Sequence, residues 1–79
     1  MEWKSVKLPT GAKLFRVHAF TFVVGGATYQ IEVDEYQDGN CTGHAERSTD
    51  KSSIVEPVSA RSIKDCLEGL IGRIKSRHP

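Results

Sequence analysis

Apolar and polar residues alternate on both sides of a glycine pair, Gly25-Gly26. Two glycines can both take positive φ, which a two-residue type I′ turn between antiparallel strands requires. Such a turn fixes the register of the two strands, with Val24 opposite Ala27. One face of the predicted hairpin is then mostly apolar: His18, Phe20, Phe22, Val24, Ala27, Tyr29, Ile31 and Val33. The other face is mostly polar, as in a sheet that is buried on one side only.

A second turn is predicted at residues 38–40, where Asp, Gly and Asn tolerate left-handed backbone. A third strand follows it, over about residues 41–47. If residues 38–40 form a three-residue loop, small residues suited to lie beneath a helix share the apolar face: Cys41, Gly43 and Ala45. A two-residue loop would instead bring His44 beside Val33. We favour the three-residue loop because it buries neither His44 nor Glu46.

The clearest helical pattern lies near the C-terminus. Apolar residues recur there at the spacing of one buried helical face: Ile63, Cys66, Leu67, Leu70, Ile71 and Ile74. Ser59 is the favoured N-cap, because Val58 and Ile63 then flank it as a hydrophobic staple. Ser62, with Asp65 three residues later, is the competing start. The helix is expected to pack on a cross-strand patch of Phe20, Phe22, Tyr29 and Ile31.

The remaining segments carry weaker signals. Residues 48–53 indicate a polar loop without periodicity, and residues 54–55 leave room for a short fourth strand before Pro57. At the N-terminus, residues 1–12 are weakly determined, and residues 9–11 (Pro-Thr-Gly) indicate a turn. Three apolar residues before this turn are expected to cover one edge of the core: Trp3, Val6 and Leu8. Residues 77–79 are expected to fray.

These elements predict the fold class. Residues 1–79 are expected to form one small α+β domain, a three-stranded antiparallel β-meander packed against one C-terminal amphipathic helix. A chain of 79 residues has room for one core and no deep cleft, so we expect no enzyme, no cofactor and no small-molecule ligand. No apolar run approaches the roughly 20 residues of a membrane span. No apolar segment follows residues 1–4, so we expect no secretory signal and a cytoplasmic location.

The net charge of +1 is unevenly distributed along the chain. Residues 1–26 carry +3, residues 27–50 carry −5 and residues 51–79 carry +3. Proteins that bind nucleic acids usually show a clear basic excess, so we do not expect a nucleic acid as the partner. The alternative is weak nucleic-acid binding by the basic end of the helix, through Arg73, Lys75 and Arg77. The same three cations also suit the negative pole of the helix dipole.

Two groups of residues are candidates for a metal site or a catalytic site. Cys41 and His44 form a Cys-x-x-His pair that His18 and Cys66 could complete as a metal site. Zinc requires four closely placed ligands, and here they are dispersed, so we expect no metal and two reduced cysteines. For His18, the nearest cross-strand carboxylate is that of Glu35, but neither is accompanied by a nucleophile in a recognisable catalytic setting.

The sequence combines three predicted strands and a helix, in that order, with an acidic middle strand and an Asp38-Gly39 turn. The helix is entered through residues 59–62 (Ser-Ala-Arg-Ser) and continues through residues 65–67 (Asp-Cys-Leu). Over residues 27–76 this arrangement resembles small HicB-type antitoxin modules, and it is also similar to the latter part of a double-stranded RNA-binding domain. The HicB-type proline- and glycine-rich loop is missing, as is the basic run that opens the RNA-binding helix, so no functional residues carry over.

The predicted architecture favours a small protein-interaction or regulatory module. A three-stranded sheet has two edges, and an open edge can bind a further strand. One helix covers one face of the sheet, so the other face remains available as an interface. A partner protein or a second copy of the chain, giving a homodimer, is therefore the expected partner.

Overall fold

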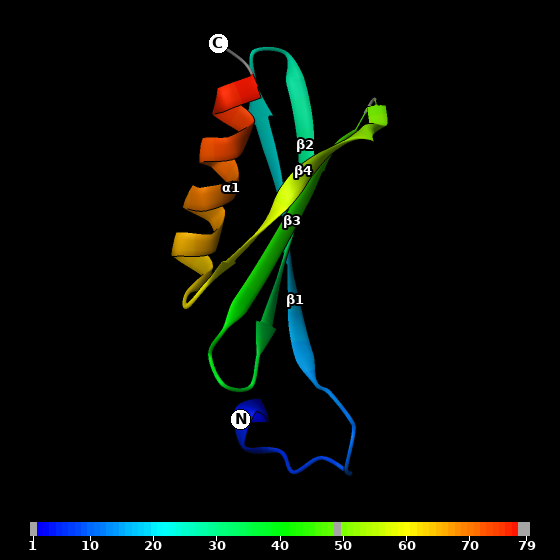
Figure 1. Ribbon diagram of the computed structural model, residues 1–79, viewed down its shortest axis with the longest axis vertical. Coiled ribbons are helices and arrows are strands. Elements are labelled where there is room, and N and C mark those ends of the chain that lie inside the picture. The colour runs from blue at the N-terminus through cyan, green and yellow to red at the C-terminus, as the bar shows by residue number, and fades with distance from the viewer. Residues whose placement is uncertain (1, 49, 78–79) are drawn as a thin grey trace.

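The computed structural model describes residues 2–48 and 50–77, and their side chains except those of residues 50–54 and 77. Four antiparallel strands form one sheet in the order β1 (Phe15–Val24), β2 (Ala27–Tyr36), β3 (Cys41–Arg47) and β4 (Asp50–Ala60). The helix α1 (Ile63–Arg77) lies against one face, on the β4 side of the sheet (Figure 1). A 3₁₀ turn, η1 (Trp3–Ser5), precedes the sheet. The predicted α+β meander with a C-terminal helix is confirmed.

The β1–β2 hairpin has the predicted turn and register. Gly25 and Gly26 have φ of +53° and +79°, as a type I′ turn requires. Val24 pairs with Ala27, and the register continues without interruption to Phe15 and Tyr36. The turn and the face pattern therefore specify the same pairing.

The loop before β3 begins one residue earlier than predicted. It comprises residues 37–39, and the Tyr36 N–H donates to the Asn40 carbonyl oxygen at 2.9 Å. Gly39 has a φ of +93°, in the left-handed region. The sequence had also allowed Asn40 to adopt this backbone conformation. Cys41 therefore pairs with Glu35. The predicted facing of the strand is nevertheless confirmed, because the three small residues are buried: Cys41, Gly43 and Ala45.

The fourth strand is much longer than predicted. β4 replaces most of the expected polar loop of residues 48–53 and pairs with β3 over its length. The register shifts between Gly43 and Ala45, which lie opposite Val58 and Val55 respectively. Because of this irregularity Val55 and Val58 are three residues apart yet belong to the same face. The period-2 pattern that would identify a strand is thereby interrupted.

The helix begins after Ser62, the alternative N-cap, and not after Ser59. Ser62 is the N-cap, since its hydroxyl oxygen accepts a hydrogen bond from the Asp65 N–H at 3.1 Å. The expectation that Ser59 caps the helix is wrong: Ser59 still belongs to β4, where it pairs with Thr42. Pairing with β3 holds that residue extended until the chain turns into the helix.

The core lies between α1 and the strands β2, β3 and β4. Its most deeply buried members come from all four elements: Ile31, Val33, Cys41, Val55, Cys66, Leu70 and Ile74. Phe22 and Leu67 are partly buried and pack against this cluster. Phe20, which was expected in the same patch, is instead exposed. The helix packs mainly on β4 and β3 and does not cover this part of β1.

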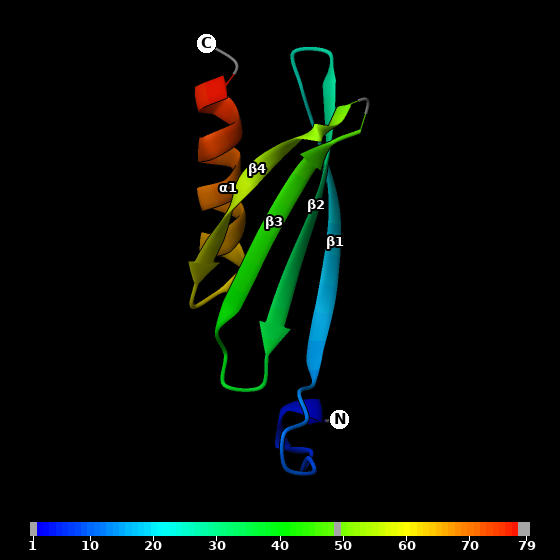
Figure 2. The same ribbon diagram turned by 45° about the vertical axis from the view of Figure 1, so that its right-hand side comes forward.

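The N-terminal segment does not cover the core as expected. The predicted turn at residues 9–11 is confirmed, with the Ala12 N–H donating to the Pro9 carbonyl at 3.0 Å. The segment lies beyond the end of the sheet, however, beside the loop between β2 and β3 (Figures 1 and 2). There the Gln37 side chain donates to the Val6 carbonyl at 2.9 Å. Polar contacts at this end help to position residues 2–12, and Trp3 and Leu8 are half-buried there, outside the main core.

Candidate interaction surface at the edge of the sheet

The strand β1 forms an uncovered edge of the sheet, which we call the β1 edge (residues 15–24). Figure 2 shows β1 on the side of the sheet away from α1. Three of its apolar side chains are exposed: Val17 at 49%, Phe20 at 37% and Val23 at 64%. Phe15 and the preceding Leu14 are also exposed, at 42% and 37%. A run of exposed apolar residues on a monomer surface is typical of an interaction site.

Both faces of the β1 edge carry exposed apolar side chains. Phe20 lies opposite Ile31, on the helix-covered side of the sheet, but beyond the reach of the helix. Val17 and Val23 lie on the opposite face, beside the polar residues Asp34 and Thr28 of β2. A partner strand placed along this edge would therefore shield apolar groups above and below the sheet.

The backbone of β1 also presents free hydrogen-bonding positions. In an antiparallel pair closed by a two-residue turn, alternate residue pairs exchange both backbone hydrogen bonds. Val24 and Ala27 close the turn, so the even-numbered residues of β1 bond to β2. The backbone groups of the odd-numbered residues then point outward from the edge: Val17, Ala19, Thr21 and Val23. These groups are a template for another strand.

The β1 edge lacks the features that usually prevent such pairing. Exposed edge strands in monomers commonly carry lysines, prolines or bulges. The ten residues of β1 include no lysine and no proline, and the pairing with β2 is regular throughout. Its one permanent charge is that of Arg16. The strand is thus long, regular and nearly uncharged.

A polar cluster holds the N-terminal segment against the end of the hairpin. Lys4 Nζ lies 2.8 Å from Glu35 Oε2, and His18 Nε2 lies 2.9 Å from Glu35 Oε1. The hydrogen bond from Lys4, supported by that of His18, lowers the pKa of the Glu35 carboxyl. The hydrogen bond to Glu35 in turn raises the pKa of the Lys4 ammonium group. The structure therefore brings together His18 and Glu35 as the sequence suggested, within an ion cluster.

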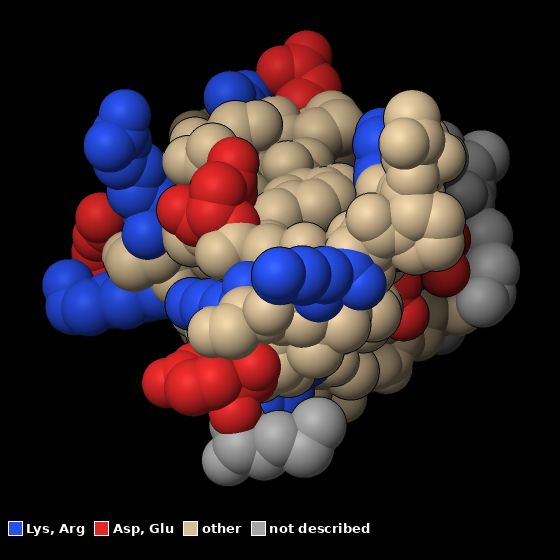
Figure 3. Space-filling model, turned by 90° about the horizontal axis from the view of Figure 1, so that it is seen from below, with Lys and Arg blue, Asp and Glu red and all other residues tan. Residues whose placement is uncertain are grey.

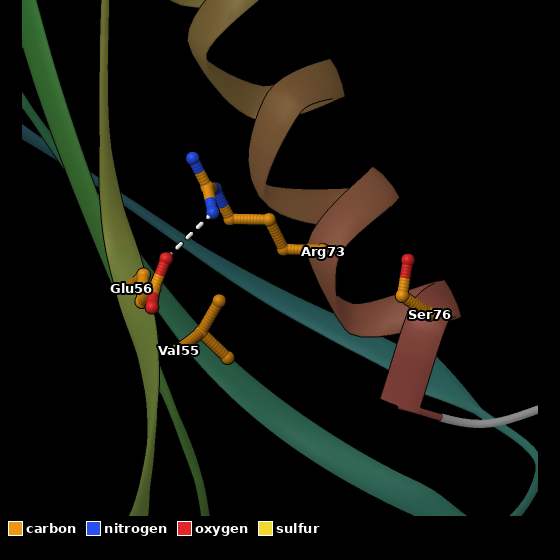
Figure 4. A pocket seen from close by; sticks show the side chains of 4 residues that line it. All are labelled: Val55, Glu56, Arg73 and Ser76. Atoms are coloured by element: carbon orange, nitrogen blue, oxygen red, sulfur yellow. Dashed lines mark hydrogen bonds and ion pairs between the residues drawn. The ribbon is translucent and has the colours of Figure 1, made fainter.

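The basic end of the helix is partly neutralised. Figure 4 shows Arg73 reaching from α1 to Glu56 on β4, with an N–O distance of 2.8 Å. The pair lies in a shallow pocket of about 260 Å³ that Val55 and Ser76 also line. Lys75 is exposed, and the side chain of Arg77 lies outside the described residues. The sequence did not reveal the Glu56 partner because β4 was not expected to extend beside the helix.

Charges of both signs are interspersed at the end of the molecule that carries the N-terminal segment. In the view from this end, Lys and Arg side chains alternate with Asp and Glu side chains and with uncharged surface (Figure 3). The described part of this face therefore presents no continuous basic patch. Such a patch is the usual electrostatic footprint of nucleic-acid binding.

The residues considered for a metal site lie on different faces. Cys41 is buried beneath the helix, whereas His44 is exposed on the other face, 3.2 Å from Glu32. Cys66 is buried and its thiol lies 3.4 Å from the Val58 carbonyl oxygen. Both cysteines are free, and burial raises the pKa of each thiol. Among the described residues, no three His, Cys, Asp or Glu side chains are grouped as metal ligands.

Comparison with known proteins adds no identification. No family model matches the sequence, and neither curated proteins nor solved structures give a significant match. The resemblances to HicB-type modules and to double-stranded RNA-binding domains therefore stay predictions. None of the described helices is long and apolar enough to cross a membrane.

Proposed function

We propose that the chain is a small, non-catalytic protein-interaction module that binds its partner by strand addition along the β1 edge. The observation that carries this proposal is the combination on one strand of exposed apolar side chains, outward backbone groups and nearly no charge. Strand addition obtains affinity from main-chain hydrogen bonds and specificity from alternate side chains. The exposed positions of β1 can supply both.

A pair of lysine substitutions tests the proposal. Val23→Lys adds a charge to the exposed β1 edge, and Ser59→Lys adds the same charge to an exposed residue of β4, at the other edge of the same sheet. Each tagged protein would be used to capture partners from cells, including untagged copies of the chain. Partners identified by mass spectrometry would be purified and their affinities measured directly.

We expect Val23→Lys to weaken partner binding, because the lysine ammonium would have to be desolvated at the new strand pair. Ser59→Lys should bind as the wild type does. Equal binding by both variants, with both folded by circular dichroism, would show that the β1 edge is not the binding surface.

A further inference from the structure

Three exposed apolar residues of the β1 edge are spaced symmetrically along the strand. Val17 precedes Phe20 by three residues, and Val23 follows it by three. All three are exposed, while the positions between them are polar, small or partly buried. A pattern that reads alike in both directions matches an antiparallel copy of itself, which is the requirement for an isologous two-fold interface.

From this symmetry we infer that the partner is a second copy of this chain, paired antiparallel through β1 about a two-fold axis at Phe20. The inference rests on the proposed function of the β1 edge and names its occupant. In this register Phe20 lies opposite Phe20 of the second copy. Val17 of each copy lies opposite Val23 of the other, so each of these three exposed side chains gains an apolar partner.

The backbone groups also fit this register. Val17 and Ala19 lie opposite Val23 and Thr21 of the second copy, and the backbone groups of all four point outward from β1. These pairs would exchange the hydrogen bonds, while Phe20 occupies a non-hydrogen-bonded position between them. Arg16 lies opposite the apolar Val24 of the second copy, so no like charges face each other directly.

The alternative register, centred on Ala19, matches the surface less well. It would pair Val23 with Phe15, but it would place the exposed Val17 opposite Thr21 and Phe20 opposite His18, which is held by Glu35. Two apolar side chains would then face polar ones. The register centred on Phe20 therefore follows from the side chains, since both registers use the same outward backbone groups.

Neither the helix nor the N-terminal segment obstructs the pairing. The helix packs mainly on β4 and β3, away from β1. The N-terminal segment lies beyond one end of the sheet, with Trp3 beside Phe15 and Arg16 and outside residues 17–23 (Figures 1 and 2). A two-fold axis perpendicular to the sheet keeps each face continuous across the new pair. The dimer would be an eight-stranded antiparallel sheet with both helices on one face.

The chain exposes more surface than a compact monomer of its mass. The chain exposes 5469 Å², whereas a monomer of 8.7 kDa typically exposes about 4,700 Å². Its radius of gyration is 14.2 Å, against about 12 Å for a compact chain of this length. The excess is that of an elongated chain, whose N-terminal segment lies beyond the end of the sheet and whose strand β1 is uncovered.

Engineered disulfides test both the partner and the register. Phe20→Cys would place two thiols on the two-fold axis, with Cα atoms about 4.5 Å apart in a non-hydrogen-bonded pair. This separation is within the range of about 4.4–6.8 Å that a disulfide spans. Ala19→Cys is the matched control, because it would be on the axis only in the alternative register. Wild-type protein controls for Cys41 and Cys66, which are buried and free.

We expect Phe20→Cys to form a covalent dimer under mild oxidation, faster than Ala19→Cys, and wild type to form none. A second arm avoids altering Phe20: a mixture of Val17→Cys and Val23→Cys should give the mixed disulfide, and either variant alone should not. Sedimentation of wild type at high concentration should give twice the mass of 8.7 kDa, and Val23→Lys should remain monomeric.

A wild-type chain that is monomeric at every concentration would overturn the inference. If Val23→Lys nevertheless lost other protein partners, the proposed function would stand while the identity of the occupant was wrong. Faster cross-linking of Ala19→Cys than of Phe20→Cys would overturn the register. A dimer that Val23→Lys leaves intact would show that the copies associate through another surface.

Discussion

Two glycines set how closely the helix approaches the sheet. A Cβ atom on Gly43 in β3 would lie 2.6 Å from Cys66 Sγ and 2.7 Å from Leu70 Cδ1. A Cβ atom on Gly69 in α1 would lie 2.8 Å from Cγ1 of Val58. Real side chains do not approach this closely, so the helix rests on β3 and β4 only because both positions lack a side chain.

Gly43→Ala should therefore destabilise the fold. The added methyl group would push against two fully buried side chains, and overpacking of this kind typically costs about 1–3 kcal/mol. Gly72→Ala is the matched control, because nothing lies within 4 Å of its Cβ position. That change should be neutral or stabilising by up to about 1 kcal/mol through helix propensity. Urea unfolding of the two variants measures the difference, and equal stabilities would contradict the close contact at Gly43.

The ion cluster at the end of the hairpin predicts a pH dependence. The folded-state pKa of Glu35 is lowered by Lys4 and His18. Its stabilisation is therefore full above the unfolded pKa, about 4.3, and is lost as the pH falls through the lower folded pKa. Glu35→Gln should be less stable than wild type at neutral pH, and this difference should shrink in acid.

Denaturant unfolding of Glu35→Gln at neutral and acidic pH measures this effect. Glu68→Gln is a suitable control, since its pair with Lys64 is a surface i,i+4 contact, which contributes little. A difference between Glu35→Gln and wild type that is the same at both pH values would contradict the proposed linkage.

At the level of elements, a helix or strand was predictable from the sequence where independent local signals, such as turn residues and the face pattern, agreed. The β1–β2 hairpin was predictable in every pair because the Gly25-Gly26 turn and the face pattern require the same register. β4 was not, because the register shift places Val55 and Val58 on one face and removes the strand periodicity. The sequence also could not predict which strands the helix covers. Phe20 was therefore assigned to the correct face of the sheet but wrongly to the core.

The start of the helix offers a direct comparison of two serines. Ser62→Ala removes the cap of the Asp65 N–H and should cost about 1 kcal/mol. Ser59→Ala changes an exposed strand residue and should stay within about 0.5 kcal/mol. Thermal and urea unfolding would measure both. A larger loss for Ser59→Ala would contradict the observed helix start.

At the scale of the whole molecule, the sheet extends further than its single helix can cover. The chain measures 45 × 21 × 20 Å, with the helix on the β4 side and β1 uncovered. The sequence predicted an open sheet edge and a protein partner. It could not indicate which edge, because that depends on the length of β4 and on the lateral position of the helix. Both follow from tertiary contacts rather than from local pattern.

Amide hydrogen exchange along β1 tests the central claim most directly, because it reports on the outward backbone groups themselves. The amides of Phe20 and Phe22 bond to β2 and serve as internal references within the same strand. The outward amides are those of Val17, Ala19, Thr21 and Val23. When the β1 edge is occupied, we expect these four to exchange at least about tenfold more slowly than in Val23→Lys, with the two references unchanged. Fast exchange of the four outward amides in wild type at every protein concentration and with every captured partner would contradict strand addition at the β1 edge.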